Sequence, residues 1–187
     1  MTKQRCAWCG TDPLYVEYHD TEWGVPVYDD DKLFEFLILE TFQAGLSWIT
    51  VLRKRENFRK AFDGFDYKKI ATYGEKKYLE LLQDAGIIRN KLKIKATINN
   101  AVAFMEIQKE FGSFSKYIWE FTNRKPIKNK LKNLSEAPAT TDLSDKLSKD
   151  LKKRGFKFVG STVMYAHMQA TGMVNDHLID CFRYDEV

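Results

Sequence analysis

The spacing of the apolar residues is the feature that most limits the folds open to this chain. They recur at the three- and four-residue intervals of an α-helix, whereas alternation with a period of two rarely extends beyond a few residues. Capping residues stand at suitable places, such as the acidic cluster 29–31 before one apolar run and Ser47 before the next. We therefore predict an all-α fold, with helices over residues 32–43, 48–62, 75–85, 90–111, 114–121, 143–154 and 161–170.

The length of the chain, 187 residues with 44% hydrophobic residues, is enough for a substantial core. We predict a single domain over residues 1–187, built of two closely packed helical lobes. The stretch 122–141 contains two prolines and many polar residues, so it is predicted to be a long loop or a connection between the lobes. The chain shows no apolar run of membrane-spanning length and no secretion signal, so we expect no membrane contact and a cytoplasmic location.

Basic residues are concentrated near two predicted helices. Residues 121–160 hold eleven Lys or Arg against four Asp or Glu, which favours contact with a polyanion, although most charge runs are simply solvated faces. Between the helices 143–154 and 161–170 lies a short turn bracketed by two glycines, where main-chain N–H groups can face a phosphate. The candidate DNA contacts of this hairpin, at about residues 152–160, are Lys152, Lys153, Arg154, Gly155, Lys157 and Gly160.

Glu40 lies on the apolar stripe of its predicted helix, with Leu33, Phe36, Leu37 and Ala44 at helical spacing around it. A buried carboxylate costs several kcal/mol unless it is paired, so such a glutamate has either a partner or a task. An ion pair with one of the many arginines is the structural alternative. Aromatic residues crowd the N-terminal segment, at Trp8, Tyr15, Tyr18 and Trp23, and Trp48 opens the second predicted helix. A carboxylate with aromatic faces suits a positively charged base, although most aromatic side chains belong to the core.

Three cysteines in a chain without a secretion signal indicate metal binding or simple burial rather than disulfides. His177 and Cys181 would share one face of a helix, and Cys6 and His19 could complete a tetrahedral Cys2His2 zinc site that ties the two termini together. Cys6 and Cys9 also form a CxxC pair, which is a rival ligand set or a redox motif.

Several long motifs in order resemble the 3-methyladenine DNA glycosylase I family, from about Cys6 to Tyr184. They are CAW, DPLYVEYHDTEWGVP, QAGLSWITVLRKRENF, QDAGIIRNK, LKKRGFKFVG and GMVNDH. The resemblance implies a helix-hairpin-helix glycosylase fold whose hairpin binds the backbone of double-stranded DNA. It also implies one structural zinc ion on Cys6, His19, His177 and Cys181, with Cys9 outside the site. The base pocket implied by the family falls on Glu40 in the catalytic role, with Tyr18 and Trp48, and with Tyr15 and Trp8 as neighbours.

One position departs from the wider helix-hairpin-helix superfamily. Many relatives have an aspartate that assists cleavage where we align Asn175, and the neighbouring Asp176 is in the wrong register. We expect little acid–base help to be needed, because methylation at N3 makes adenine a cationic and therefore good leaving group. The expected reaction is hydrolytic excision of N3-methyladenine from alkylated DNA by a monomer, leaving an abasic site.

Two other functions are consistent with parts of the sequence. A non-catalytic protein that binds alkylated DNA would keep the fold and pocket, and the missing aspartate motivates it. A zinc hydrolase is suggested by the dipeptide His19-Asp20, but four protein ligands would leave no open coordination position for catalysis.

Overall fold

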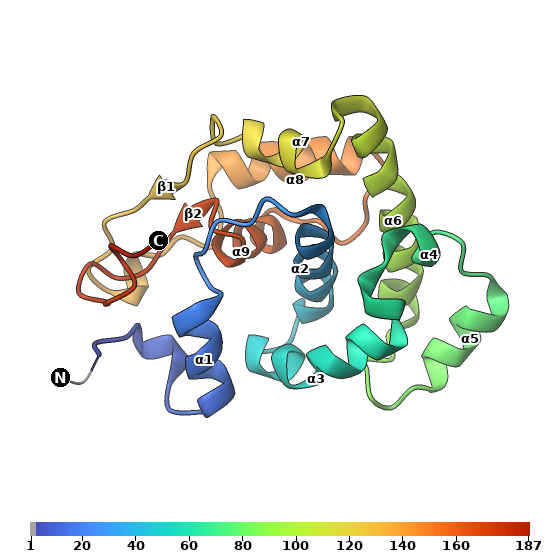
Figure 1. Ribbon diagram of the computed structural model, residues 1–187, viewed down its shortest axis with the longest axis horizontal. Coiled ribbons are helices and arrows are strands. Elements are labelled where there is room, and N and C mark those ends of the chain that lie inside the picture. Colours follow the sequence, from blue (N-terminus) through green and yellow to red (C-terminus); the bar gives the residue numbers. More distant parts are fainter. Residues whose placement is uncertain (1–2) are drawn as a thin grey trace.

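Helices dominate the computed structural model, which describes residues 3–187 (Figure 1). This confirms the predicted all-helical fold class. The α-helices are α1 (Pro13–Thr21), α2 (Asp30–Gln43), α3 (Trp48–Ala61), α4 (Tyr67–Ile70), α5 (Glu75–Gln83), α6 (Lys91–Phe111), α7 (Phe114–Glu120), α8 (Asp142–Lys153) and α9 (Ser161–Ala170). The other regular elements of the described residues are three short 3₁₀ helices and two strands. They are η1 (Ala7–Cys9), η2 (Asp63–Phe65), η3 (Leu134–Glu136), β1 (Ile127–Lys128) and β2 (Val174–Asn175).

Local sequence accounts for most helix starts. The Asp29 side chain accepts a hydrogen bond from the Lys32 amide and caps α2, and Asn90 caps α6 in the same way. Ser47 does stand before α3, but its hydroxyl bonds the Thr50 hydroxyl at 2.8 Å, so the predicted side-chain cap is absent.

Several parts of the chain differ from the prediction, including α4, a helix of four residues that was not predicted. Helix α1 forms where no helix was predicted, with Asp12 as its cap and Pro13 in its first turn. The segment 122–141 contains strand β1, which pairs in parallel with β2, so that Ile127 lies opposite Val174. Strands of two residues are too short to produce a visible alternation in the sequence.

Helix α2 runs through the middle of the molecule (Figure 1) and is buried from Leu33 to Phe42. It packs against α3, α6, α7 and α9, and one hydrophobic cluster extends from Tyr18 to Val174. Each fully buried Leu or Phe contributes about 1.5–3 kcal/mol to stability. This core can therefore offset the cost of burying a polar side chain such as Glu40 in the same helix. The division into two lobes stays a prediction.

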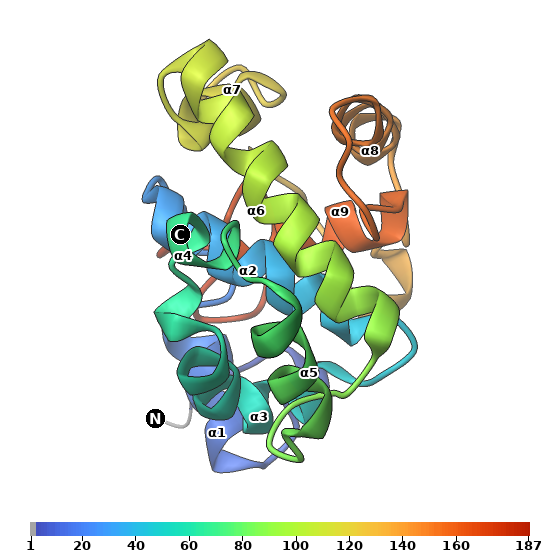
Figure 2. The same cartoon turned by 90° about the vertical axis from the view of Figure 1, so that its right-hand side faces the viewer.

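Helix α6 crosses the molecule diagonally in the second view, with α7 at its end (Figure 2). Helices α8 and α9 pack against each other and are joined by a turn in which Gly155 has a φ of 92° and Phe158 a φ of 58°. The two helices flanking the predicted hairpin are thus present with nearly the predicted bounds.

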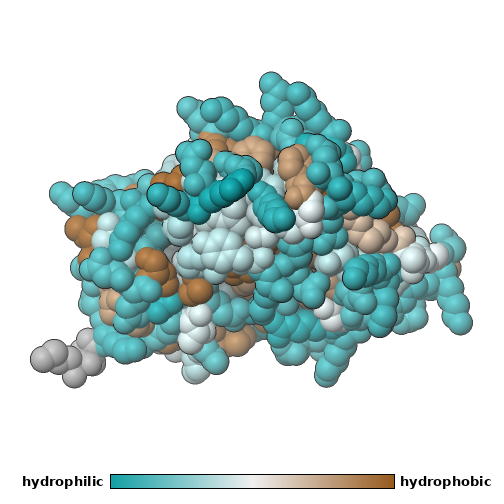
Figure 3. Space-filling view, turned by 45° about the horizontal axis from the view of Figure 1, so that its top comes forward, coloured by the Kyte–Doolittle hydropathy of each residue, from teal (hydrophilic) through white to brown (hydrophobic). Residues whose placement is uncertain are grey.

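The face drawn in Figure 3 is mostly hydrophilic, with small separate hydrophobic patches. Among residues 3–187, no helix has the length and hydropathy needed to span a membrane. The cytoplasmic location stays a prediction.

Candidate active site and metal-ligand cluster

Glu40 is buried near the end of α2, with 3% of its surface exposed. Its Oε2 atom has no hydrogen-bond partner among residues 3–187, and burial raises the pKa of the carboxyl to about 8. The expected alternative, an ion pair with an arginine, is not what the structure has. Arg55 and Arg59 instead bind Glu35, which precedes Glu40 by five residues in α2, and each of the two bonds is 2.7 Å long.

A pocket of about 200 Å³ opens beside Glu40. All four aromatic residues predicted for the base site line it, together with seven further residues: Trp8, Tyr15, Tyr18 and Trp48, then Trp23, Gln43, Leu134, Ala137, Ala166, Gln169 and Asp176. The rings pack edge-on or tilted, with 5.0 Å between the centroids of Trp8 and Tyr15 and 5.5 Å between those of Tyr18 and Trp48. The pocket is therefore an aromatic enclosure around one carboxylate.

The indole N–H groups of Trp8 and Trp48 are also buried without a partner in the described part of the chain. Together with Glu40, they give the pocket two unused donors and one unused acceptor. Buried polar atoms are satisfied in most native proteins, so three orphans around one cavity point to a ligand or to water that occupies it.

A larger cavity, of about 500 Å³, lies between α1, α2 and α3 and shares Tyr18 with the pocket. Its arginines are already paired: Arg53 binds Asp12 at 2.6 Å, and Arg55 binds Glu22 at 2.8 Å. Because no buried unpaired carboxylate and no aromatic enclosure line this larger cavity, the smaller pocket is the better candidate site despite its size.

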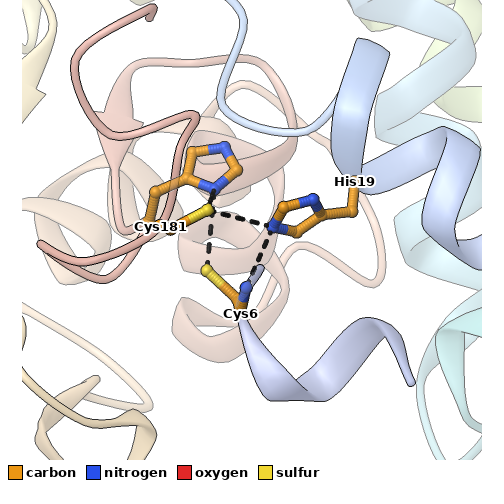
Figure 4. Close-up of side chains that lie close together, drawn as sticks. Cys6, His19 and Cys181 are labelled. Carbon is orange, nitrogen blue, oxygen red and sulfur yellow. Dashed lines mark hydrogen bonds between the residues drawn. The ribbon is translucent and has the colours of Figure 1, made fainter. Parts of the chain in front are cut away.

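The four predicted metal ligands come together in one buried cluster. The candidate ligand atoms of Cys6, His19, His177 and Cys181 all lie within 4.8 Å of one another, and the side chains of Cys6, His19 and Cys181 point toward a common centre (Figure 4). The Cys181 Sγ atom is 3.5 Å from both His19 Nε2 and His177 Nδ1, and Cys6 Sγ is 3.6 Å from His177 Nδ1. A tetrahedral ion with bonds of about 2.0–2.3 Å places its ligands roughly 3.3–3.8 Å apart. The residues therefore fit a metal ion.

Neighbouring groups hold the two imidazoles in the orientation that a metal requires. His19 Nδ1 bonds the Asp20 carboxylate at 2.8 Å, and His177 Nε2 bonds the Trp23 carbonyl oxygen at 3.0 Å. Each ring therefore presents its other nitrogen to the cluster. Cys9 lies outside the group of four, and its thiol donates to the Cys6 carbonyl oxygen at 3.1 Å.

The expected helical spacing of His177 and Cys181 is wrong, because the segment after β2 consists of turns rather than a helix. The Cys181 amide donates to the Leu178 carbonyl oxygen, and the next residue, Phe182, donates to that of Gln4. The bond between Phe182 and Gln4 thus joins the two terminal segments beside the cluster. The cluster also supports the pocket, since the ring centroids of His19 and Trp8 are 5.3 Å apart.

Asn175 and Asp176 have different surroundings. Asn175 accepts a bond from the His177 amide and donates to the Tyr184 and Val187 carbonyl oxygens, so its side chain serves the C-terminal turns. Asp176 lines the pocket. The sequence reasoning, which set Asp176 aside on register, missed this residue. Adjacent residues of an extended segment face opposite sides, so only one of Asn175 and Asp176 can face the pocket. The sequence does not show which one, and the fold does.

The hairpin residues differ in whether their side chains and amides are already engaged in contacts within the protein. Lys152, Lys153 and Lys157 are exposed. Arg154 is engaged with Glu110 at 2.7 Å and with Asp150 at 2.8 Å, and its guanidinium lies over Phe111. The N–H groups of Phe158, Val159 and Gly160 take part in none of the hydrogen bonds of residues 3–187. These amides and lysines are the groups available to an anion.

An aromatic pocket around an unpaired carboxyl group, set in a helical fold, suits a flat, positively charged ring. A family model described as methyladenine glycosylase matches residues 8–184. The chain belongs to this methyladenine glycosylase family.

Known relatives match almost the whole chain. DNA-3-methyladenine glycosylase 1 of Escherichia coli strain K12 is 52% identical over 181 residues, which cover 97% of each chain. A crystal structure of a 3-methyladenine DNA glycosylase I has 51% identity and a TM-score of 0.93, covering 96% of this chain and 98% of the other. The crystal structure of a variant 3-methyladenine DNA glycosylase I in complex with 3-methyladenine has 37% identity and a TM-score of 0.93, covering 95% and 96%.

Proposed function

We propose that this protein is a monofunctional DNA glycosylase that hydrolytically excises N3-methyladenine from alkylated double-stranded DNA and leaves an abasic site. The observation that carries the proposal is Glu40, buried and without a partner in an aromatic pocket of about 200 Å³. A methylated adenine supplies what the pocket lacks: a flat ring for the aromatic faces and a positive charge for the carboxylate.

Glu40 also provides a basis for selectivity. In the free protein burial raises the pKa of Glu40 to about 8, so the group is largely protonated near neutral pH. A cationic base in the pocket would favour the ionised carboxylate, which then accepts hydrogen bonds from the ring. Neutral adenine carries no positive charge that could offset the cost of ionising the buried Glu40. Its glycosidic bond is also intrinsically stronger.

The reaction needs no further reagent than water. The damaged nucleotide leaves the base stack and its base enters the pocket. As the bond between C1′ and N9 breaks, its electron pair passes to the ring, which departs as neutral 3-methyladenine. The water oxygen then bonds to C1′ and one proton is released to solvent. None of the described residues that line the pocket is a lysine, which supports hydrolysis rather than a lyase step.

The Cys6, His19, His177 and Cys181 cluster would hold one zinc ion, for which two thiolates and two imidazoles are a suitable donor set. Bound there, zinc supplies stability by joining the N-terminal and C-terminal segments. The four side chains complete a tetrahedron and leave no place for water or substrate, which argues against a zinc hydrolase. Trp8, Tyr15 and Tyr18 belong to the segment that this cluster anchors.

For DNA, we propose that the hairpin binds phosphates through the free amides at Phe158, Val159 and Gly160 and through Lys152, Lys153 and Lys157. Gly155 permits the left-handed backbone of the turn. Arg154 is assigned a supporting role, because its guanidinium is occupied by Glu110 and Asp150. A lesion on one strand needs no two-fold symmetry, which supports action as a monomer.

Release of free bases from methylated duplex DNA tests the function directly. The wild type should release 3-methyladenine and not 7-methylguanine, and Glu40→Gln should lower the rate by about 100-fold or more while remaining folded. Glu106→Gln, at an exposed glutamate on α6, is the matched control and should leave the rate unchanged. Binding of methylated DNA by the wild type without any base release would instead support the non-catalytic damage-binding protein.

A further inference from the structure

The base pocket contains a second buried carboxylate, Asp176, which the proposed function does not yet use. Asp176 follows β2, has 4% of its surface exposed and lines the same cavity as Glu40. Within residues 3–187 it forms no ion pair with Lys, Arg or His. Its charge is therefore not neutralised by a neighbouring cation.

Three neutral donors hold this carboxylate in place. The Tyr165 hydroxyl donates to Oδ2 at 2.6 Å, Gln169 Nε2 donates to the same atom at 2.8 Å, and Asn129 Nδ2 donates to Oδ1 at 2.7 Å. Hydrogen bonds from neutral groups stabilise a carboxylate without cancelling its field. The pocket thus has an oriented, hydrogen-bonded carboxylate at Asp176 in addition to the unpaired carboxyl group of Glu40.

One donor to Asp176 comes from a segment that also reaches the solvent-exposed edge of the pocket. Its donor Asn129 lies in the segment 122–141, and the same segment adds the exposed Leu134 and the half-buried Ala137 to the pocket lining. The sugar of a flipped nucleotide remains attached to the DNA backbone and so stays nearer the mouth than its base. The base would therefore approach Glu40, and the sugar would approach Asp176.

We propose that Asp176 stabilises the positive charge that develops on the deoxyribose as the base departs, an inference that rests on the proposed glycosylase function. When the C1′–N9 electron pair passes to the ring, the base becomes neutral and the sugar carries the positive charge until the water oxygen bonds to C1′. A negative charge fixed beforehand beside C1′ lowers the energy of this state without any rearrangement. Asp176 acts through its charge in every turnover, and Tyr165, Gln169 and Asn129 position it.

The test separates the rate of cleavage from DNA affinity. Asp176→Asn should lower the single-turnover rate of 3-methyladenine release by about 100-fold. The affinity for a duplex with one tetrahydrofuran abasic-site analogue and the bound-metal content should stay within threefold of wild type. Tyr165→Phe removes one donor but keeps the charge, so its loss should be less than about tenfold. A rate for Asp176→Asn within threefold of wild type, or equal rate and affinity losses in both variants, overturns the proposal.

Asp176 directly precedes the proposed metal ligand His177, so its substitution could disturb the metal site. A second pair of variants therefore changes Gln169 instead. Gln169→Lys places a cation against Asp176 and should slow release by about 100-fold. Gln169→Met removes the same donor without adding a charge, so its loss should stay below about tenfold, as for Tyr165→Phe. Equal rates in these two variants reject the role of the charge even where Asp176→Asn loses its metal. Failure of the wild type to release any base refutes the proposed function instead, so the two failures are distinguishable.

Discussion

Asn100 of α6 forms two hydrogen bonds with the main chain of Lys157 in the hairpin, 57 residues away. Its Nδ2 donates to the Lys157 carbonyl oxygen at 3.0 Å, and its Oδ1 accepts from the Lys157 amide at 2.8 Å. The Asn100 side chain is fully buried, and its neighbour Asn99 donates to the Gly155 carbonyl oxygen at 2.8 Å. The conformation of the hairpin is therefore set by α6 as well as by its own glycines.

Asn100→Ala should weaken DNA binding and leave the base pocket unchanged. The substitution leaves the Lys157 amide and carbonyl unpaired, which costs about 1–3 kcal/mol of stability and loosens the turn. Affinity for undamaged duplex DNA, measured by fluorescence anisotropy at fixed salt, should fall, whereas affinity for free 3-methyladenine should not. Asn99→Ala removes only one bond to the hairpin, that to the Gly155 carbonyl oxygen, at an exposed position, so it should have the smaller effect. Unchanged DNA affinity in Asn100→Ala would contradict a role for the hairpin in binding.

The salt dependence of DNA binding should identify the lysines that contact phosphate. Replacing Lys157 with Ala should lower the slope of log affinity against log salt by about 1, because one fewer counterion is released. Lys76→Ala, an exposed lysine on α5, is the control and should keep the wild-type slope. A slope that changes equally in both variants would assign the effect to net charge and not to the hairpin.

Glu40 should make the protein less stable as the pH rises. Its carboxyl has a pKa of about 8 when folded and an ordinary value of 4.5, so the folded state retains a proton that the unfolded chain has lost. Between these values the contribution of Glu40 to the unfolding free energy falls by up to about 1.4 kcal/mol per pH unit. Glu40→Gln should therefore be more stable than wild type at pH 8.5, and the gain should shrink at pH 5.5.

Urea unfolding of both proteins at the two pH values measures this difference. Glu35→Gln provides the control on the same helix, because burial opposes ionisation of Glu35 but Arg55 and Arg59 lower its pKa overall. That variant should be less stable than wild type at both pH values. A pH-independent difference between wild type and Glu40→Gln would show that Glu40 has a partner.

The metal cluster should be structural and independent of Cys9. Purified protein should contain about one zinc ion per chain, by the four-ligand geometry of the site. Cys181→Ser should lose the metal and melt at a lower temperature, whereas Cys9→Ser should keep both the metal and the wild-type melting temperature. Loss of activity on chelation, with the fold intact and activity restored by added zinc, would point to a catalytic metal instead.

The aromatic faces of the pocket should contribute directly to base affinity. Trp48→Ala should weaken binding of free 3-methyladenine by about 1–3 kcal/mol, the usual contribution of one stacked base. Calorimetry or tryptophan fluorescence would measure it. Tyr28→Ala provides the control, because Tyr28 is exposed, stacks on Trp119 and does not line the pocket. Equal affinities in wild type and Trp48→Ala would place the base elsewhere.

The sequence by itself determined most of the helices, because caps and apolar spacing act within a few residues of one another. Helix α9 has the predicted bounds, and α2 begins beside the predicted acidic cluster. The family motifs also predicted the metal ligands and the aromatic residues of the pocket. The structure brings the ligands together in one cluster and the aromatic residues together in one pocket.

Only the tertiary structure decided which charged groups are paired and which face the pocket. The apolar stripe singles out Glu40, but nothing local shows that Glu35 binds Arg55 and Arg59 while Glu40 remains alone. The choice of Asp176 over Asn175 depends on how an extended segment lies against α9, since a shift of one residue exchanges the two faces. Contacts of this kind join residues far apart in the chain, so they are set by the packing of the whole core and not by the order of neighbouring residues.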